Sequence, residues 1–189
     1  MLFIIELLVT ILGGILAIFI HQYTKSLTSY LLGDKDIKKS GQLTLNPFKY
    51  IDGIGFICII TWGYGWGKNI KTNNLYYKDR KKATLITYTA PIIANLLFGA
   101  IFCNLTSLWG WFSIIGRLNL SLAVFNLIPI YPLCGEKILR HFLNPNNSIK
   151  YMQIEPTIRM LVLLFIAMGY VQVFLNSIIN LIQNLVTFI

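Results

Sequence analysis

The apolar stretch Leu2–Leu32 constrains this chain more than any other feature. From Leu2 to Ile20 the only charged residue is Glu6. A helix of that length measures about 28 Å, close to the roughly 30 Å hydrocarbon core of a bilayer. Only helices and closed barrels satisfy their backbone polar groups inside lipid. The stretch therefore predicts a transmembrane helix, against which the rest of the chain packs.

A short polar patch, HQYTK, interrupts the apolar stretch near its inner end. Its first and last residues, His21 and Lys25, are four positions apart and therefore lie on the same helix face. Ionisable groups at this depth in a membrane are costly, and they are functional candidates by default. We therefore expect the functional site at His21.

The composition agrees with a membrane protein and argues against nucleic acid as a partner. The chain is 56% hydrophobic and carries a net charge of +9. Ten of its Lys and Arg residues fall in Lys35–Lys49 and Lys68–Lys82, and four in Lys137–Arg159. Such banding is typical of cytoplasmic loops under the positive-inside rule. We expect a multi-pass protein of the cell membrane, with membrane lipids around it, basic loops in the cytoplasm and the N-terminus outside.

Three further apolar stretches predict membrane spans. Ala83–Leu105 and Ile114–Leu133 are long enough to cross a bilayer once each. Met160–Ile189 carries no charge over thirty residues, which predicts a long tilted span or a span with a kinked tail. The fold class expected is an all-α integral membrane protein, a polytopic helical bundle with three to four full spans in a single transmembrane domain over residues 1–189.

Shorter segments between these spans predict other structures. Ile51–Trp66 has an apolar middle too short to cross a bilayer and basic flanks on both sides, which predicts a re-entrant segment. Gln42–Leu45 alternates polar and apolar residues, which predicts a short extended piece that ends at Asn46-Pro47. Gly135–Arg159 is polar and contains a turn signal, which predicts a loop.

Four strings occur along the chain in a recognisable order: HQYTK at His21–Lys25, GQLTLNPFKYID at Gly41–Asp52, GWGKNIKTN at Gly65–Asn73 and FNLIPIYPLCG at Phe125–Gly135. Together with Ala90-Pro91 followed by Asn95, they resemble the short, minimal branch of the site-2 protease family of intramembrane zinc metalloproteases. The resemblance covers a core of about residues 21–143. It leaves the C-terminal apolar stretch at 160–189 outside.

The resemblance implies where a zinc site would lie. In the family the first string is H-E-x-x-H, in which two histidines bind zinc and the glutamate is the general base. By position, His21 corresponds to the first ligand, Gln22 to the base, Lys25 to the second ligand and Cys134 to the third ligand, an aspartate in the family. Only His21 keeps its residue type. Gln22 has no basic lone pair and a protonated Lys25 has none at all, whereas a Cys134 thiolate can bind zinc.

The resemblance also implies a groove for a substrate strand, formed by Asn46, Pro47, Asn95, Asn126 and Pro129. The asparagines have an alternative explanation, because Asn46, Asn95 and Asn126 can instead form hydrogen bonds between helices. The sequence leaves both explanations open.

These substitutions lead to one main functional hypothesis and two alternatives. The main hypothesis is a catalytically inactive family member, a pseudoprotease that binds transmembrane segments of other proteins without cutting them and needs no cofactor. Its partners would be single-span membrane proteins or an active paralogue. One alternative is an active zinc protease with an altered metal site made of His21, Cys134 and a third group such as Asp52. The other is a membrane scaffold or transport subunit that shares only the family's architecture.

Overall fold

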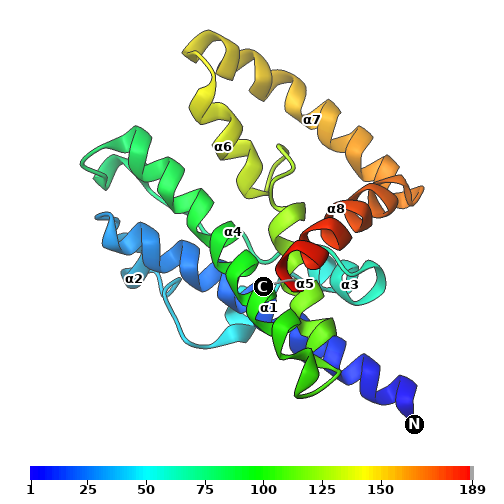
Figure 1. Cartoon of the computed structure of the whole chain (residues 1–189). Helices are drawn as coiled ribbons and strands as arrows, with labels where there is room; N and C mark the ends of the chain where they lie inside the picture. The colour runs from blue at the N-terminus through cyan, green and yellow to red at the C-terminus, as the bar shows by residue number, and fades with distance from the viewer. Residues whose placement is uncertain (188–189) are drawn as a thin grey trace.

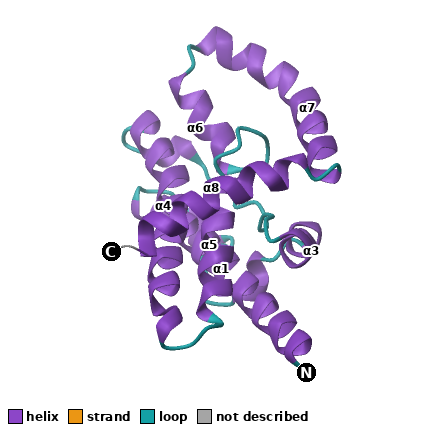
Figure 2. Ribbon diagram, turned by 45° about the vertical axis from the view of Figure 1, so that its right-hand side comes forward, coloured by secondary structure: helices purple, strands orange, loops and turns teal. Residues whose placement is uncertain are grey.

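A computed structural model describes residues 1–187 of the chain, and these residues form helices joined by loops, with no strand among them (Figures 1 and 2). The helices are α1 (Leu2–Leu31), α2 (Asp36–Lys39), α3 (Gly53–Trp62), α4 (Arg80–Asn104), α5 (Phe112–Phe125), α6 (Cys134–Phe142), α7 (Pro145–Ala167) and α8 (Tyr170–Thr187), with 3₁₀ turns at Pro47–Tyr50, Asn74–Tyr76 and Leu105–Ser107. The expected all-α membrane fold is therefore confirmed.

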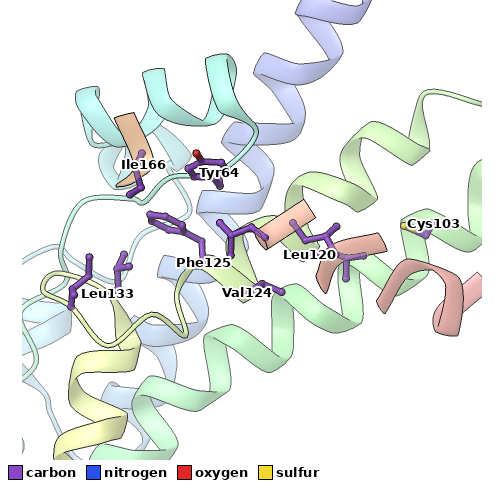
Figure 3. Close-up of a cluster of buried hydrophobic side chains, with 10 residues drawn as sticks. Tyr64, Cys103, Leu120, Val124, Phe125, Leu133 and Ile166 are labelled. Atoms are coloured by element: carbon purple, nitrogen blue, oxygen red, sulfur yellow. The ribbon is translucent and has the colours of Figure 1, made fainter. Parts of the chain in front are cut away.

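Helices α1, α4 and α5 pack against one another and form the centre of the bundle. Within the described residues, α1 and the stretch Arg80–Ser107 are each long and apolar enough to cross a membrane. These two elements confirm the first two predicted spans to within a few residues. On one side of α5, Leu120, Val124 and Phe125 pack with Tyr64 and Ile166 into a buried apolar cluster (Figure 3).

Two glycines allow α4 and α5 to approach each other closely. A Cβ atom on Gly116 of α5 would lie 2.6 Å from Cys103 Sγ and 2.8 Å from Cys103 N, both on α4. A Cβ on Gly99 of α4 would lie 2.6 Å from Leu120 Cδ2. Small residues at such positions bring helix backbones together in membranes. The α4–α5 contact therefore depends on these two positions.

We predict that Gly116→Ala lowers the free energy of unfolding by about 1–3 kcal/mol, because overpacking a tight contact forces neighbouring atoms apart. Titration with SDS in mixed micelles measures this change. Gly110→Ala is the matched control, since a Cβ there has no atom within 4 Å. Equal stability of the two variants would contradict the inferred contact.

The region predicted to be re-entrant is the short helix α3 and a loop that returns beside it. α3 ends at Gly63, whose φ of +79° lies in the left-handed region. A Cβ on Gly55 would collide with the carbonyl oxygen of Trp66, and a Cβ on Gly65 with that of Gly55. Helix and loop therefore lie in direct contact, as a re-entrant segment requires. The predicted extended piece Gln42–Leu45 forms no regular element and has bends at Leu43 and Leu45.

Two other predictions from the sequence are wrong. The expected span Ile114–Leu133 overlaps only α5, a helix of 14 residues that begins at Phe112 and already ends at Phe125. Pro129 and Pro132 then keep the chain in a turn, because proline cannot continue a helix. The expected loop Gly135–Arg159 contains most of α6 and the first part of α7.

The apolar C-terminal region is bent. Helices α7 and α8 meet at 81° around Gly169, whose φ is +81°. The pair counts as one further span only if it is treated as a broken helix. Two or three spans therefore replace the expected three to four among the described residues, and Ile189, the last residue of the predicted stretch, lies outside them.

Candidate functional site

The polar patch of α1 is buried where four helices meet. His21 and Lys25 are each only 2% exposed. Opposite them lie Asn95 of α4, Asn119 of α5 and Cys134 of α6, all at most 1% exposed. Three of these residues, His21, Asn95 and Cys134, come from separate strings of the sequence, and hydrogen bonds join all but Lys25 into one chain.

This chain of hydrogen bonds runs from α5 through α4 and α1 to α6. Asn119 donates from Nδ2 to the carbonyl oxygen of Ile115, at 2.9 Å, and accepts at Oδ1 from Asn95 Nδ2, at 3.0 Å. The same Asn95 Nδ2 donates to the carbonyl oxygen of Ala17, at 3.1 Å. Asn95 Oδ1 lies 2.9 Å from His21 Nδ1, and His21 Nε2 lies 3.4 Å from Cys134 Sγ.

The hydrogen-bond chain determines the protonation of His21. Asn95 Nδ2 faces two acceptors and donates to both, so Oδ1 is the atom of this amide that accepts. His21 Nδ1 therefore carries the proton, and Nε2 presents a lone pair. Cys134 Sγ–H donates to that lone pair. The imidazole thus presents the lone pair of Nε2 to whatever occupies the position of the thiol.

Cys134 is placed by a close contact at the start of α6. Gly135 N donates to Asn126 O at 2.8 Å, and a Cβ on Gly135 would run into the carbonyl oxygens of Leu127 and Ile128. Glycine is therefore required after Cys134. Burial raises the pKa of the Cys134 thiol, while the positive charge of Lys25 acts in the opposite direction.

Lys25 has neither a hydrogen bond nor a salt bridge within the described part of the chain. Its Nζ lies 4.5 Å from the centroid of the Tyr88 ring, in a cation–π contact. The Lys25 side chain therefore ends inside the bundle and does not extend to the membrane interface. Gln22, at the general-base position, is 6% exposed, and its Oε1 has no hydrogen-bond partner.

The donor atoms do not fit a catalytic zinc ion. Such a site ordinarily has three protein ligands and one open position. His21 and Cys134 supply two donors, and the family's second ligand position is occupied by Lys25, whose amine has no lone pair for a metal while it is protonated. No group of three His, Cys, Asp or Glu side chains suited to a metal occurs among residues 1–187. Asp52 does not complete the set, because it caps α3 by accepting from Gly55 N at 2.9 Å.

The predicted groove residues differ in their contacts. Only Asn95 belongs to the hydrogen-bond chain. Asn46 is exposed and accepts from Phe48 N, with Pro47 beginning the 3₁₀ turn, whereas Asn126 donates within its own helix to Leu122 O. Pro129 is exposed, and its carbonyl accepts from the Tyr151 hydroxyl. The structure thus supports the interhelical role for Asn95 and gives Asn46 a local capping role.

Two residues of the site were missed from the sequence. Asn119 is an isolated amide in an apolar helix, the kind of residue that often bonds across helices in membranes. Its polar side chain in an apolar stretch could have identified Asn119 as a candidate. Only the register of α5 against α4 shows that it reaches Asn95. Tyr88 carried no signal, because tyrosines are common in this chain.

Fold and site together describe an integral membrane protein with a buried His–Cys–Asn cluster between its helices. The profile of Peptidase family M50 matches residues 3–170. YwhC of Bacillus subtilis (strain 168), named as a zinc metalloprotease, is 32% identical over 157 residues, which cover 75% of this chain and 72% of YwhC. The chain therefore belongs to Peptidase family M50, the site-2 proteases.

A second relative is more distant. Rip2 of Mycolicibacterium smegmatis, also named as a zinc metalloprotease, is 25% identical over 155 residues, which cover 75% of this chain and 60% of Rip2. No solved structure gives a significant match. The predicted resemblance to the site-2 protease family is therefore confirmed, while the roles of the individual site residues stay predictions.

Proposed function

We propose that this chain binds transmembrane segments of other membrane proteins in the site of its family, without zinc-dependent hydrolysis. The observation that carries the proposal is Lys25. Its buried ammonium lies on the face of α1 that carries His21, at the family's second ligand position. A tethered cation there would replace the charge that a metal would bring.

A cavity next to the site supports the binding of a segment. It has a volume of about 230 Å³ and is lined by residues from the loop after α3 and from the turn before α6. Leu133 and Glu136, which flank Cys134 in sequence, both line it. A peptide strand in this cavity would pass close to the buried cluster.

Photo-crosslinking tests segment binding. A benzoyl-phenylalanine at Tyr131, which lines the cavity and is 47% exposed, should give adducts whose partner peptides are transmembrane segments. The matched control is the same residue at Leu97 on the outer face of α4, which is 59% exposed. Adducts equal at both positions would contradict a segment site and leave only a scaffold role.

An altered zinc site is the second candidate, because His21 Nε2 and Cys134 Sγ face each other at 3.4 Å. It requires a third ligand that replaces or displaces Lys25. Zinc that is bound stoichiometrically and lost in Cys134→Ala would favour this candidate.

We further propose that the basic loops face the cytoplasm. The α6–α7 connection lies at the end of the molecule opposite the N-terminus and the α4–α5 turn (Figures 1 and 2). In a variant without native cysteines, Asn73→Cys should resist a membrane-impermeant maleimide added from outside, whereas Leu108→Cys in the α4–α5 turn should react. Labelling of position 73 from outside would contradict this orientation.

A further inference from the structure

The residues that do not fit zinc have the arrangement of a thiol nucleophile with its base. We propose that Cys134 is the nucleophile of a metal-independent acyl transfer, that His21 is its general base, and that Asn95 positions the imidazole. The inference rests on the proposed function, because the acyl donor would be a peptide carbonyl of a membrane segment held in the site.

The geometry meets the three requirements of such a triad. The nucleophile and the base are within hydrogen-bond distance of each other, with Cys134 Sγ 3.4 Å from His21 Nε2. The base has its lone pair on the nitrogen that faces the thiol, because Asn95 Oδ1 accepts from Nδ1 at 2.9 Å. The orienting residue is itself held by Ala17 and Asn119. The same Cys–His–Asn roles occur in papain-like proteases on an unrelated fold, so a triad is recognised by geometry.

Two features next to Cys134 act on negative charge at its sulfur. Cys134 is the first residue of α6, and no side chain caps that helix. Amide groups at a helix N-terminus have no partners within the helix and stabilise negative charge. Lys25 acts on the same thiol against the larger effect of burial, which raises the pKa of the thiol. Compared with the family's zinc ligands, cysteine at position 134 and lysine at position 25 weaken metal binding. In the thiol scheme Cys134 and Lys25 each have a role.

The reaction balances with water as the only co-reactant. The Cys134 thiol gives its proton to His21 Nε2 while sulfur attacks the carbonyl carbon, forming a C–S bond and an oxyanion. The intermediate collapses, the C–N bond breaks, and His21 gives the proton to the departing amine. Water then attacks the thioester, His21 takes its proton, and the C–S bond breaks. The proton returns to sulfur, leaving an acid and an amine.

Acylation of the full-length protein in detergent tests the inference. With p-nitrophenyl acetate, mass spectrometry should find an acetyl group on Cys134 that neutral hydroxylamine removes, well ahead of any at Cys58 or Cys103. His21→Ala should slow the acylation by about 100-fold or more, the usual effect of losing a general base. Asn95→Ala should slow it as well, and Asn95→Asp should restore part of the rate, because aspartate still accepts from Nδ1.

Acylation of Cys134 no faster than that of Cys58, or unchanged in a folded His21→Ala variant, would overturn the inference. Crosslinking from Tyr131, repeated in Cys134→Ala, separates this failure from that of the proposed function. Captured segments without acylation of the natural chain would leave segment binding intact and remove the thiol chemistry. Acylation without captured segments would contradict segment binding and the proposed acyl donor together.

Discussion

The variant Gln22→Glu, Lys25→His and Cys134→Asp should bind about one zinc per chain, since a catalytic site needs three protein ligands with a fourth position open. The two histidines would share a face of α1, and the aspartate would begin α6, where Sγ now lies 3.4 Å from His21 Nε2. Metal affinity should return before proteolysis, because cleavage also needs water and a correctly placed substrate. Inductively coupled plasma mass spectrometry on the purified variant measures the zinc content per chain.

Two of the single changes, Gln22→Glu and Cys134→Asp, are the controls for the triple variant. Neither alone should bind zinc stoichiometrically, because each leaves Lys25 at a ligand position and so only two ligands. A triple variant that folds but gains no zinc would show that positions 21, 25 and 134 do not converge on a metal.

The second large effect is expected at Asn95. Asn95→Leu should lower the free energy of unfolding by about 3 kcal/mol, because each buried polar group left without a partner costs roughly 1–3 kcal/mol. The groups affected are His21 Nδ1, Asn119 Oδ1 and the carbonyl of Ala17. SDS titration measures the change, and Asn104→Leu, at the exposed end of α4, should cost far less.

A double-mutant cycle identifies the cause. If Asn95 and Asn119 act as one network, Asn95→Leu and Asn119→Leu should be non-additive by about 0.5–3 kcal/mol. Strict additivity would mean that the two amides contribute separately, and the hydrogen-bond chain would lose its energetic meaning.

The sequence predicts the fold well where the composition of a stretch alone determines its structure. α1 and α4 were found to within a few residues because uninterrupted apolar stretches leave few alternatives in a membrane. Gly135–Arg159 was mistaken for a loop because its polar composition hides two helices. α6 is held by ion pairing between Glu136 and Arg140 at 2.9 Å, and α7 begins at Pro145, which suits the first turn of a helix.

The site, too, could be predicted from the sequence only in part. The shared face of His21 and Lys25 follows from helix periodicity, and the family resemblance implied that Cys134 approaches them. The contact of Asn95 with Asn119 depends on how α4 and α5 are rotated against each other, which the glycines Gly99 and Gly116 help to determine. No single-sequence pattern encodes that rotation.

The zinc content of the natural chain tests the central claim most directly. The full-length protein should be purified in detergent without chelators, supplied with zinc and then freed of excess metal. We expect well under one zinc per chain, because two donors beside a buried ammonium do not hold the ion. One zinc per chain, retained through dialysis and lost in Cys134→Ala, would contradict a zinc-independent site.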